Sequence, residues 1–469
     1  MPRYPESIYA FKHAFILVLL FNTFPFLLQA QLKAEGWETS NDKTMLLSKM
    51  NSLEAGNGQT EIININAEKK YQSVDGFGFA LTGGSAQHLS RMSAPQRKKL
   101  LSELFGNGPD QVGISYLRVS IGASDLNEYV FSYDDLKAGE TDAELKHFSL
   151  SQDEKDMVPV LKEILAISPK IKIMGSPWSA PVWMKSNQNV QGGRLMDKYY
   201  STYASYFVKY IQAMKSHGIA IDAVTIQNEP FNDGNTPSMQ FLAKEALRFI
   251  RDHLGPAFKR EGIKTKIVLY DHNCDAPEYP ISILADREAA SYIDGSGFHL
   301  YAGQTSAMGK VHDAFPDKSI YFTEMMAVSK DGGFNTAYPV GRILIGALRN
   351  WSKNVILWNL AADPKYNPHT DNGGCSICQG AVTIDGDKVE RNLAYYVIAH
   401  ASKFIPFGSS RIESTLTTKV SNVAFLTPEG KRVLIVSNNS AEPHTVKVVE
   451  GGQSFSYTIN KGSSTTHIW

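Results

Sequence analysis

The feature that most constrains the fold is a regular alternation of strand-like and helix-like segments between Gly76 and Ala394. Eight short runs predict strands: Phe77–Ala80, Tyr116–Ile121, Ile171–Gly175, Ala223–Gln227, Lys266–Tyr270, Gly297–Tyr301, Ser319–Thr323 and Val355–Asn359. Amphipathic segments between them predict helices, among them Ala94–Leu104, Asp153–Ile167, Tyr199–His217, Ser238–Leu254 and Ala337–Asn350. Eight β-α repeats in about 320 residues predict an α/β fold, a (β/α)8 TIM barrel.

The alternative arrangement of these segments is a doubly wound open sheet. A glycine-rich phosphate loop after the first strand would favour it, because such a loop opens a helix whose N-terminus holds phosphate. Gly76-Phe-Gly78 lacks both the third glycine and the start of a helix. The closed barrel is therefore the better interpretation.

The pattern changes near His400 to short alternating strands separated by Gly, Asn or Pro turns. They are Arg411–Leu416, Asn422–Leu426, Arg432–Ser437, Thr445–Val449, Ser454–Ile459 and Thr465–Trp469. This pattern predicts an appended C-terminal β-sandwich. The alternating run Glu61–Asn66 predicts an N-terminal strand that joins it. We expect a polar, flexible segment at 31–60, a strand on the sandwich at 61–75, the barrel at 76–395 and the sandwich at 396–469.

The N-terminus predicts export from the cytoplasm. Arg3 and Lys12 precede an apolar run over 14–28, which is typical of a secretory signal peptide spanning residues 1–30 and cleaved near Ala30–Gln31. An uncleaved anchor is the alternative, but the run is short and is interrupted by Pro25. We expect a secreted or periplasmic protein without stable membrane insertion.

The charges are balanced, with 47 Lys and Arg against 47 Asp and Glu. This balance predicts a mixed solvated surface. It gives no basic surface of the kind that binds nucleic acid or anionic membranes, so we expect neither partner.

Three cysteines are present, at positions 274, 375 and 378. Cys375 and Cys378 could close a short disulfide in an oxidising compartment. A lone CxxC could instead indicate metal or redox chemistry, but no second CxxC or nearby Cys/His pair completes a zinc site. We expect no metal and no cofactor.

Two glutamates follow predicted strands, Glu229 after the fourth and Glu324 after the seventh. In a (β/α)8 barrel, catalytic groups lie at the C-terminal ends of the strands. A retaining glycosidase needs two carboxylates about 5 to 5.5 Å apart, one as nucleophile and one as acid and base. Either glutamate alone could instead cap a helix or pair with a base. As a pair at these two strands, with the motif Asn228-Glu229-Pro230, they favour catalysis.

Other side chains converge on the same barrel mouth. Arg118 and Asp125 flank the end of the second strand, and Arg118 could keep the nucleophile ionised through a hydrogen bond or could form a structural ion pair. The loop Ser176–Lys185 holds Trp178 and Trp183, of which Trp178 could form a sugar wall and Trp183 could be core. The remaining strand-end residues are Asp271-His272-Asn273, His299, Tyr301, Trp358 and Asn359. A histidine on a strand is more often structural than catalytic, and His299 stays open between these roles.

In these motifs the chain resembles glycoside hydrolase family 30, the family of lysosomal glucosylceramidase and microbial β-1,6-glucanases. The resemblance rests on Val74-Asp-Gly-Phe-Gly78, Leu117-Arg-Val-Ser, Gly175-Ser-Pro-Trp178, Gln227-Asn-Glu-Pro230, Phe298-His-Leu-Tyr301, Phe322-Thr-Glu324 and Leu357-Trp-Asn359. It implies Glu229 as acid/base, Glu324 as nucleophile and Asn228 at the sugar 2-hydroxyl. It also implies that Arg118, Asp125, Trp178, His299, Tyr301 and Trp358 surround the −1 glucose.

The loop from Pro368 to Cys378 is similar to the secreted bacterial-type β-1,6-glucanase branch of that family. One departure is Cys274, where that branch usually has a tryptophan, and a cysteine cannot replace a stacking face. The first hypothesis is a secreted retaining β-glucosidic hydrolase, an (endo-)β-1,6-glucanase. A glucosylceramidase-like β-glucosidase is the alternative within the enzymes. An inactive carbohydrate-binding protein is the third, and loss of either glutamate would have indicated it.

Overall fold

Eight parallel strands close into a barrel in the order β10-β11-β4-β5-β6-β7-β8-β9. We obtained this arrangement from a computed structural model, which describes residues 1–5, 32–51, 53–54, 60–327 and 335–469. The barrel strands are β4 (Gly76–Ala80), β5 (Tyr116–Ile121), β6 (Lys172–Pro177), β7 (Ala223–Thr225), β8 (Lys266–Cys274), β9 (Ile293–Gly303), β10 (Ser319–Glu324) and β11 (Ser352–Asn359). All eight predicted strands and the predicted barrel are confirmed.

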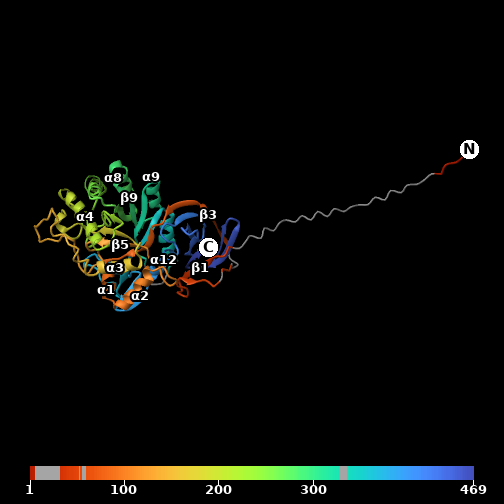
Figure 1. Cartoon of the computed structure of the whole chain (residues 1–469), viewed down its shortest axis with the longest axis horizontal. Coiled ribbons are helices and arrows are strands. Elements are labelled where there is room, and N and C mark those ends of the chain that lie inside the picture. Colours follow the sequence, from red (N-terminus) through yellow and green to blue (C-terminus); the bar gives the residue numbers. More distant parts are fainter. Residues whose placement is uncertain (6–31, 52, 55–59, 328–334) are drawn as a thin grey trace.

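Helices surround the barrel (Figure 1). They are α1 (Gly83–Arg91), α2 (Ala94–Phe105), α3 (Met157–Ile167), α4 (Tyr200–Ser216), α5 (Ala243–Phe249), α6 (Gly255–Arg260), α7 (Glu278–Leu284), α8 (Arg287–Tyr292), α9 (Ser306–Ala314), α10 (Ala337–Pro339), α11 (Gly346–Arg349) and α12 (Leu393–Ser402). The π-helical turns η3 (Ile250–Leu254) and η4 (Val340–Ile345) join α5 to α6 and α10 to α11, and η1 (Val182–Met184) and η2 (Asp197–Tyr199) are short 3-10 turns. The fourth predicted helix begins at Ala243 rather than Ser238, because residues 237–242 instead bond to neighbouring loops through Ser238 and Gln240.

The barrel interior is packed with side chains. Tyr116, Met174, Ala223, Val268, Tyr321 and Ile356 form one buried cluster, each from a different barrel strand. This filling is what an eight-stranded barrel requires, because its interior has room for side chains but not for a pore. The open, functional part of the barrel is thus confined to the strand ends.

A nine-stranded sheet arrangement forms the second unit, in the order β19-β18-β3-β15-β16-β17-β20-β1-β2. Its strands are β1 (Glu35–Ser40), β2 (Ser48–Lys49), β3 (Thr60–Ser73), β15 (Ser410–Ser414), β16 (Ser421–Leu426), β17 (Arg432–Asn438), β18 (His444–Glu450), β19 (Gln453–Ile459) and β20 (Ser463–Ile468). A smaller sheet contains β12 (Ala361–Ala362), β13 (Val382–Asp385) and β14 (Lys388–Arg391). The six predicted C-terminal strands are confirmed, and β3 joins them by pairing with both β15 and β18.

The N-terminal segment differs from expectation. Residues 35–40, which we expected to be flexible, form β1 and pair antiparallel with β20. Trp37 of β1 packs on Phe404 with ring centroids 4.8 Å apart, and this apolar contact fixes an otherwise polar strand. The predicted signal peptide lies almost wholly within residues 6–31, outside the described residues.

Helix α12 links the barrel to the sandwich through His400. This buried side chain lies between the hydroxyls of Thr39 on β1 and Thr466 on β20, 2.9 Å from each. The expected domain boundary at residue 395 falls inside α12, which continues to Ser402. Barrel and sandwich are therefore connected by one continuous helix.

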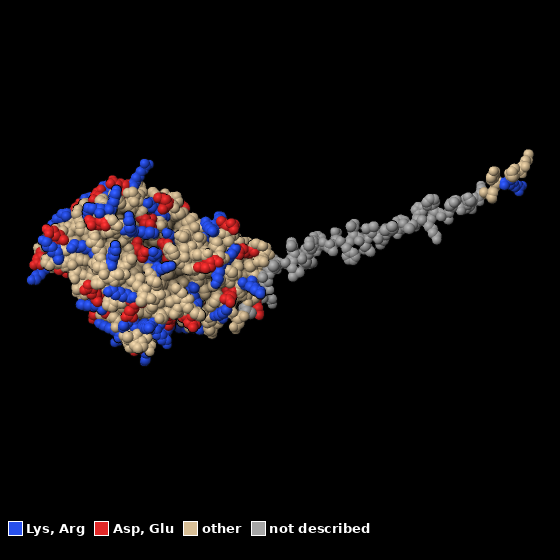
Figure 2. Space-filling view, in the orientation of Figure 1, with Lys and Arg blue, Asp and Glu red and all other residues tan. Residues whose placement is uncertain are grey.

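The visible surface carries both signs of charge interspersed, without a large area of one sign (Figure 2). This agrees with the balanced composition. Among the described residues, none of the helices combines the length and apolar character needed to cross a bilayer.

Candidate active site

A pocket of about 380 Å³ opens at the C-terminal ends of the barrel strands. The predicted site residues that line it are Asp125, Trp178, Asn228, Glu229, Tyr301, Glu324 and Trp358. Arg118 and His299 are fully buried and contact the lining residues Glu324 and Glu229, respectively. The sequence positions chosen as strand ends are thus brought together in space, because parallel strands place their carboxyl ends on one face of the barrel.

The two glutamates face each other across this pocket. One carboxylate oxygen of Glu229, one of Glu324 and a ring nitrogen of His299 all lie within 4.8 Å of one another. Both glutamates are more than nine-tenths buried. This spacing is in the range of the short carboxylate separation of double-displacement glycosidases, and shorter than the separation of roughly 6.5–9.5 Å in inverting enzymes.

Glu324 is held by two donors. Arg118 Nη1 donates to Oε2 at 2.6 Å, and the Tyr301 hydroxyl donates to Oε1 at 3.0 Å. Of the two contacts that the sequence left open for Arg118, a hydrogen bond and an ion pair, both are present at Glu324. Since Arg118 is permanently charged, it favours the ionised form of the carboxylate beside it.

Glu229 lies beside a histidine rather than an arginine. Its Oε1 is 3.1 Å from His299 Nδ1, and its Oε2 accepts from Asn232 Nδ2 at 2.6 Å. Its backbone has a φ of +48°, in the left-handed region that side-chain-bearing residues rarely adopt. Strained backbone of this kind is concentrated at functional sites, where surrounding contacts hold it in place.

Strand β7 ends at Thr225, two residues earlier than predicted, because the residues that follow it bond outside the regular ladder. The Asn228 amide donates to Pro177 O at 2.7 Å, and the Glu229 amide donates to Asp271 O at 2.9 Å. The chain thus leaves the regular ladder and is pinned between the ends of β6 and β8. That path points the Glu229 carboxylate into the pocket.

The buried acids and His299 form one coupled system. Burial alone would lower the pKa of His299, but the charge of Glu324 and the hydrogen bonds with Asp271 and Glu229 raise it to about 9. Burial raises the pKa of Glu324, and the charges of His299 and Arg118 only partly offset that rise. Burial also opposes ionisation of Glu229, but its hydrogen bond and ion pair with His299 lower its pKa. These pKa directions favour a proton on His299 over one on Glu229 in the free protein.

Three residues that line the pocket, among them His272 through its Nδ1, have a buried polar atom without a hydrogen-bond partner among the described residues. The other two atoms are Asp125 Oδ1 and Trp178 Nε1. Burial, and then the charges of Glu324 and Glu229, raise the pKa of Asp125 to about 7. Because unpaired buried polar groups are unfavourable, they are positioned for a ligand that brings its own donors and acceptors, such as sugar hydroxyls.

Sequence reasoning missed the group that organises the site, Asp271. Its fully buried carboxylate accepts from Arg118 Nη2 at 2.8 Å and from Thr225 Oγ1 at 2.7 Å, and it lies 3.0 Å from His299 Nε2. The triplet Asp271-His272-Asn273 after the fifth strand was noticed, but no role followed from it. Its partners are far away in sequence, so no local sequence pattern predicts these contacts.

Asn359, which we expected at the substrate, lies at the end of β11. It does not line the pocket, and its amide instead donates to the backbone oxygens of Ala361 and Cys378. It supports the loop whose Cys375 and Cys378 line the pocket and form a disulfide, as was anticipated.

Cys274 is buried with a free thiol and does not line the pocket, whereas the half-exposed ring of Phe231 does.

The donor set of Glu229, His299 and Glu324 is also compatible in type and spacing with a metal ion. Both oxygens of Glu324 already accept hydrogen bonds from Arg118 and Tyr301. A guanidinium directly on the carboxylate disfavours a cation there, so the arrangement fits proton and glycosyl transfer better than metal binding.

Comparison with known proteins accounts for this geometry. The model of the glycosyl hydrolase family 30 TIM-barrel domain matches residues 74–405, and that of the family's β-sandwich domain matches residues 408–467. The chain belongs to glycoside hydrolase family 30. The predicted family and enzyme class, a glycoside hydrolase, are therefore confirmed.

Similar proteins include enzymes whose names indicate different substrates. The chain is 34% identical over 423 residues to the endo-1,6-beta-D-glucanase neg1 of Aspergillus fumigatus, with 85% of each chain covered. It is 29% identical over 442 residues to lysosomal acid glucosylceramidase of Mus musculus, covering 87% of this chain and 82% of that protein. The solved structure of the endo-beta1,6-glucanase BT3312 superposes with a TM-score of 0.85 at 33% identity, covering 93% and 99% of the two chains.

Proposed function

We propose that this family 30 member is a retaining endo-β-1,6-glucanase in which Glu324 is the nucleophile and Glu229 is the general acid and base. The observation that carries the proposal is the close approach of two buried carboxylates with unlike partners, Arg118 on Glu324 and His299 on Glu229. The substrate follows from the relatives named above, of which the glucanases are the more similar.

In the first step, the ionised Oε of Glu324 attacks the anomeric carbon of the −1 glucose. The bond from that carbon to the leaving oxygen breaks, and Glu229 gives its proton to this oxygen. The products are a glycosyl ester on Glu324 and a free aglycone hydroxyl. Arg118 and the Tyr301 hydroxyl orient Glu324 and stabilise the charge that it carries before attack.

In the second step, ionised Glu229 removes a proton from water, and the water oxygen attacks the same carbon. The ester bond to Glu324 breaks, so Glu324 leaves as a carboxylate and the sugar keeps its original anomeric configuration. Glu229 is again protonated, and the cycle closes with one water consumed.

His299 supplies the proton that the first step needs. In the free protein this proton lies on Nδ1, which faces Glu229 Oε1 at 3.1 Å, and its transfer leaves a neutral imidazole whose Nε2–H still donates to Asp271. A substrate oxygen placed against Glu229 displaces water and favours the neutral acid. His299 is thus a positioning and proton-holding residue that does not itself line the pocket.

The two glucosidic substrates are separated by product analysis. Purified protein is incubated with β-1,3-, β-1,4- and β-1,6-glucans and with dispersed glucosylceramide. We expect short oligosaccharides from the linear β-1,6-glucan pustulan, and early products of β configuration by proton NMR. Glucose release from glucosylceramide alone would instead support the glucosylceramidase alternative, which the mouse relative motivates.

Replacement of Glu324 by Ala tests the nucleophile. We expect hydrolysis to fall by roughly 10⁴-fold or more with an unchanged melting temperature within a few degrees, because the covalent step has lost its attacking group. The matched control is Glu413→Ala, an acid on the sandwich strand β15. Turnover near that of the wild type in Glu324→Ala would contradict the assignment, and loss of pustulan binding as well as turnover would indicate misfolding.

We also propose export by the N-terminal signal. The basic residues followed by the apolar run over 14–28 support it, and so does the disulfide between Cys375 and Cys378, which is stable in an oxidising compartment. N-terminal sequencing of the mature protein from a culture tests this proposal, with a start near Gln31 expected. Protein retained in the cytoplasm with Met1 intact would contradict it.

A further inference from the structure

A second cluster of ligand-type side chains lies away from the pocket of the two glutamates. Asp134, Asp142 and His147 belong to the long loop between β5 and α3, and one donor atom from each lies within 4.8 Å of the others. The proposed hydrolysis uses none of them. The cluster therefore needs an explanation of its own.

Asp134 is the unusual member. Its side chain is 1% exposed, and both carboxylate oxygens are buried without a hydrogen-bond partner among the described residues. Its backbone is fixed, because Trp183 Nε1 donates to Asp134 O at 2.9 Å. A bare buried carboxylate is strongly unfavourable unless a partner neutralises it.

The two other members complete a donor set of two oxygens and one nitrogen. Asp142 is also buried, and its Oδ2 accepts from the His147 amide at 2.8 Å and lies 3.0 Å from His147 Nδ1. The His147 side chain is 69% exposed, so the cluster has access from solvent. The two carboxylates together supply two negative charges.

We propose that Asp134, Asp142 and His147 bind a divalent cation of the Zn²⁺ class, with water in the remaining positions. An imidazole with two carboxylates suits Zn²⁺ and similar ions, whereas Ca²⁺ and Mg²⁺ prefer oxygen donors alone. The cation supplies the missing partner of Asp134 and balances both carboxylates.

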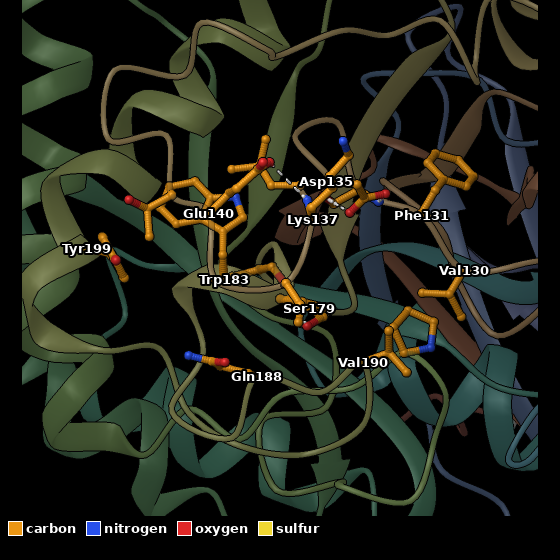
Figure 3. Close-up of a pocket in the computed structure, with 18 of the residues that line it drawn as sticks. Val130, Phe131, Asp135, Lys137, Glu140, Ser179, Trp183, Gln188, Val190 and Tyr199 are labelled. Atoms are coloured by element: carbon orange, nitrogen blue, oxygen red, sulfur yellow. Dashed lines mark hydrogen bonds between the residues drawn. The ribbon is translucent and has the colours of Figure 1, made fainter.

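The site also has a structural consequence for a neighbouring pocket of about 490 Å³. Every residue from 135 to 141 lines that pocket, and Asp134 and Asp142 directly flank this stretch. Figure 3 shows Asp135, Lys137 and Glu140 on one side of the pocket, with Gln188 and Val190 across from them. A cation bound to Asp134 and Asp142 would tie both ends of this wall together.

Isothermal titration tests the proposal with Zn²⁺ alone as the probe, after chelator treatment and in a non-coordinating buffer. We expect one site per chain, binding that is weakened by more than about tenfold in Asp134→Asn and Asp142→Asn, and slower amide hydrogen exchange over residues 134–147 when Zn²⁺ is present. The matched control is Asp135→Asn, next in the chain, whose carboxylate bonds to Ser132 instead. The measurement needs no substrate, so it does not depend on the proposed function.

Two outcomes would overturn the proposal. One is a folded wild-type protein that takes up no Zn²⁺, with Asp134→Asn as stable as the wild type or more so, since Asp134 would then be a neutral buried acid. The other is Zn²⁺ binding that Asp134→Asn and Asp142→Asn leave unchanged, because the ion would then occupy another site such as Glu229 and Glu324. If a buried variant does not fold, His147→Ala keeps the test decisive, since this exposed ring can be removed without disturbing the core.

Discussion

At the scale of single residues, the candidate site divides its charges between two carboxylates by giving them different neighbours. Arg118 cannot release a proton, so Glu324 is paired with a fixed charge. His299 can release one, so Glu229 is paired with a group that exchanges a proton with it. Asp271 accepts from both bases and holds them in position. The two carboxylates thus differ in the type of base beside each one, a fixed charge at Glu324 and a titratable ring at Glu229.

Loss of the acid has a signature that depends on the leaving group. For Glu229→Ala we expect pustulan hydrolysis to fall by roughly 10²- to 10⁴-fold, because no acid protonates the sugar oxygen. Formation of the glycosyl ester from 2,4-dinitrophenyl β-glucoside should fall far less, since that leaving group needs no proton. Pre-steady-state bursts of dinitrophenol measure this step separately from slow deglycosylation. Equal loss of the first step for both substrates would argue against the acid role.

The pH dependence of kcat/KM tests the proposed role of His299. Its pKa is raised to about 9, so the proton shared with Glu229 stays in the site until the pH approaches that value. In His299→Gln the proton is held by Glu229 alone, and the alkaline limb of kcat/KM should move toward lower pH by at least about one unit. The control is His272→Gln, a pocket residue whose Nδ1 has no protein partner among the described residues. An alkaline limb that stays in place in His299→Gln would contradict proton holding by this residue.

At the scale of elements, the loops after the strands decide what lies beyond the first glucose. Phe231 follows β7, is 42% exposed in the pocket, and packs edge-on against His272 and Tyr279. This ring offers an exposed aromatic face in the pocket, and we infer that it contacts the sugar beyond the first glucose, whereas Cys274 is buried. Position 274 therefore offers no stacking ring, and the exposed ring in this pocket comes from Phe231 on a different loop.

Removal of that ring should affect long substrates selectively. For Phe231→Ala we expect kcat/KM on pustulan to fall about tenfold, which corresponds to the loss of roughly 1.4 kcal/mol of stacking. Hydrolysis of β-glucosyl fluoride, which has no sugar aglycone, should change little. Phe231→Tyr is the control and should keep activity on both. Equal losses on the two substrates would show that Phe231 shapes the −1 pocket instead.

Sequence reasoning succeeded where function and fold share a local signature. Glu229 and Glu324 each follow an apolar strand, so their positions at the barrel mouth could be predicted from the strands alone. Asp271 follows a strand as well, but its role depends on Arg118 and His299, which only the closed barrel brings near. Strand β1 was missed because its single large apolar residue, Trp37, and its pairing with the distant β20 leave no periodic pattern.

At the scale of the whole molecule, two buried histidines make the sandwich and its junction with the barrel sensitive to acid. Burial lowers the pKa of His400 and of His467 to about 3. Between pH 6.5 and 3 the unfolded chain binds these protons and the folded chain does not. Stability is therefore full above about pH 6.5 and falls as the pH drops through this range, because the unfolded chain binds protons that the folded chain does not.

His467→Phe should reduce that acid sensitivity, because the ring nitrogens of His467 have no hydrogen-bond partner in the described part of the chain and the ring already packs against Tyr457 and Phe455. Urea unfolding at pH 7 and pH 4.5 measures the effect, and we expect a smaller difference between the two pH values than in the wild type. The control, Phe455→Leu, removes a neighbouring ring without a titratable group and should lower stability equally at both. An unchanged pH difference in His467→Phe would contradict the assignment.

The pairing of β1 with β20, and of β3 with β15 and β18, has a consequence for biosynthesis. The ribosome makes β1 and β3 before the barrel, whereas their partner strands leave the exit tunnel at the end of translation. During elongation β1 and β3 lack these partner strands, and their unpaired edges are prone to aggregation. A nascent chain stalled before residue 410 should therefore bind chaperones. Once the last sixty residues are synthesised and leave the ribosome, that binding should be lost. The second unit is completed only by the final residues of the chain.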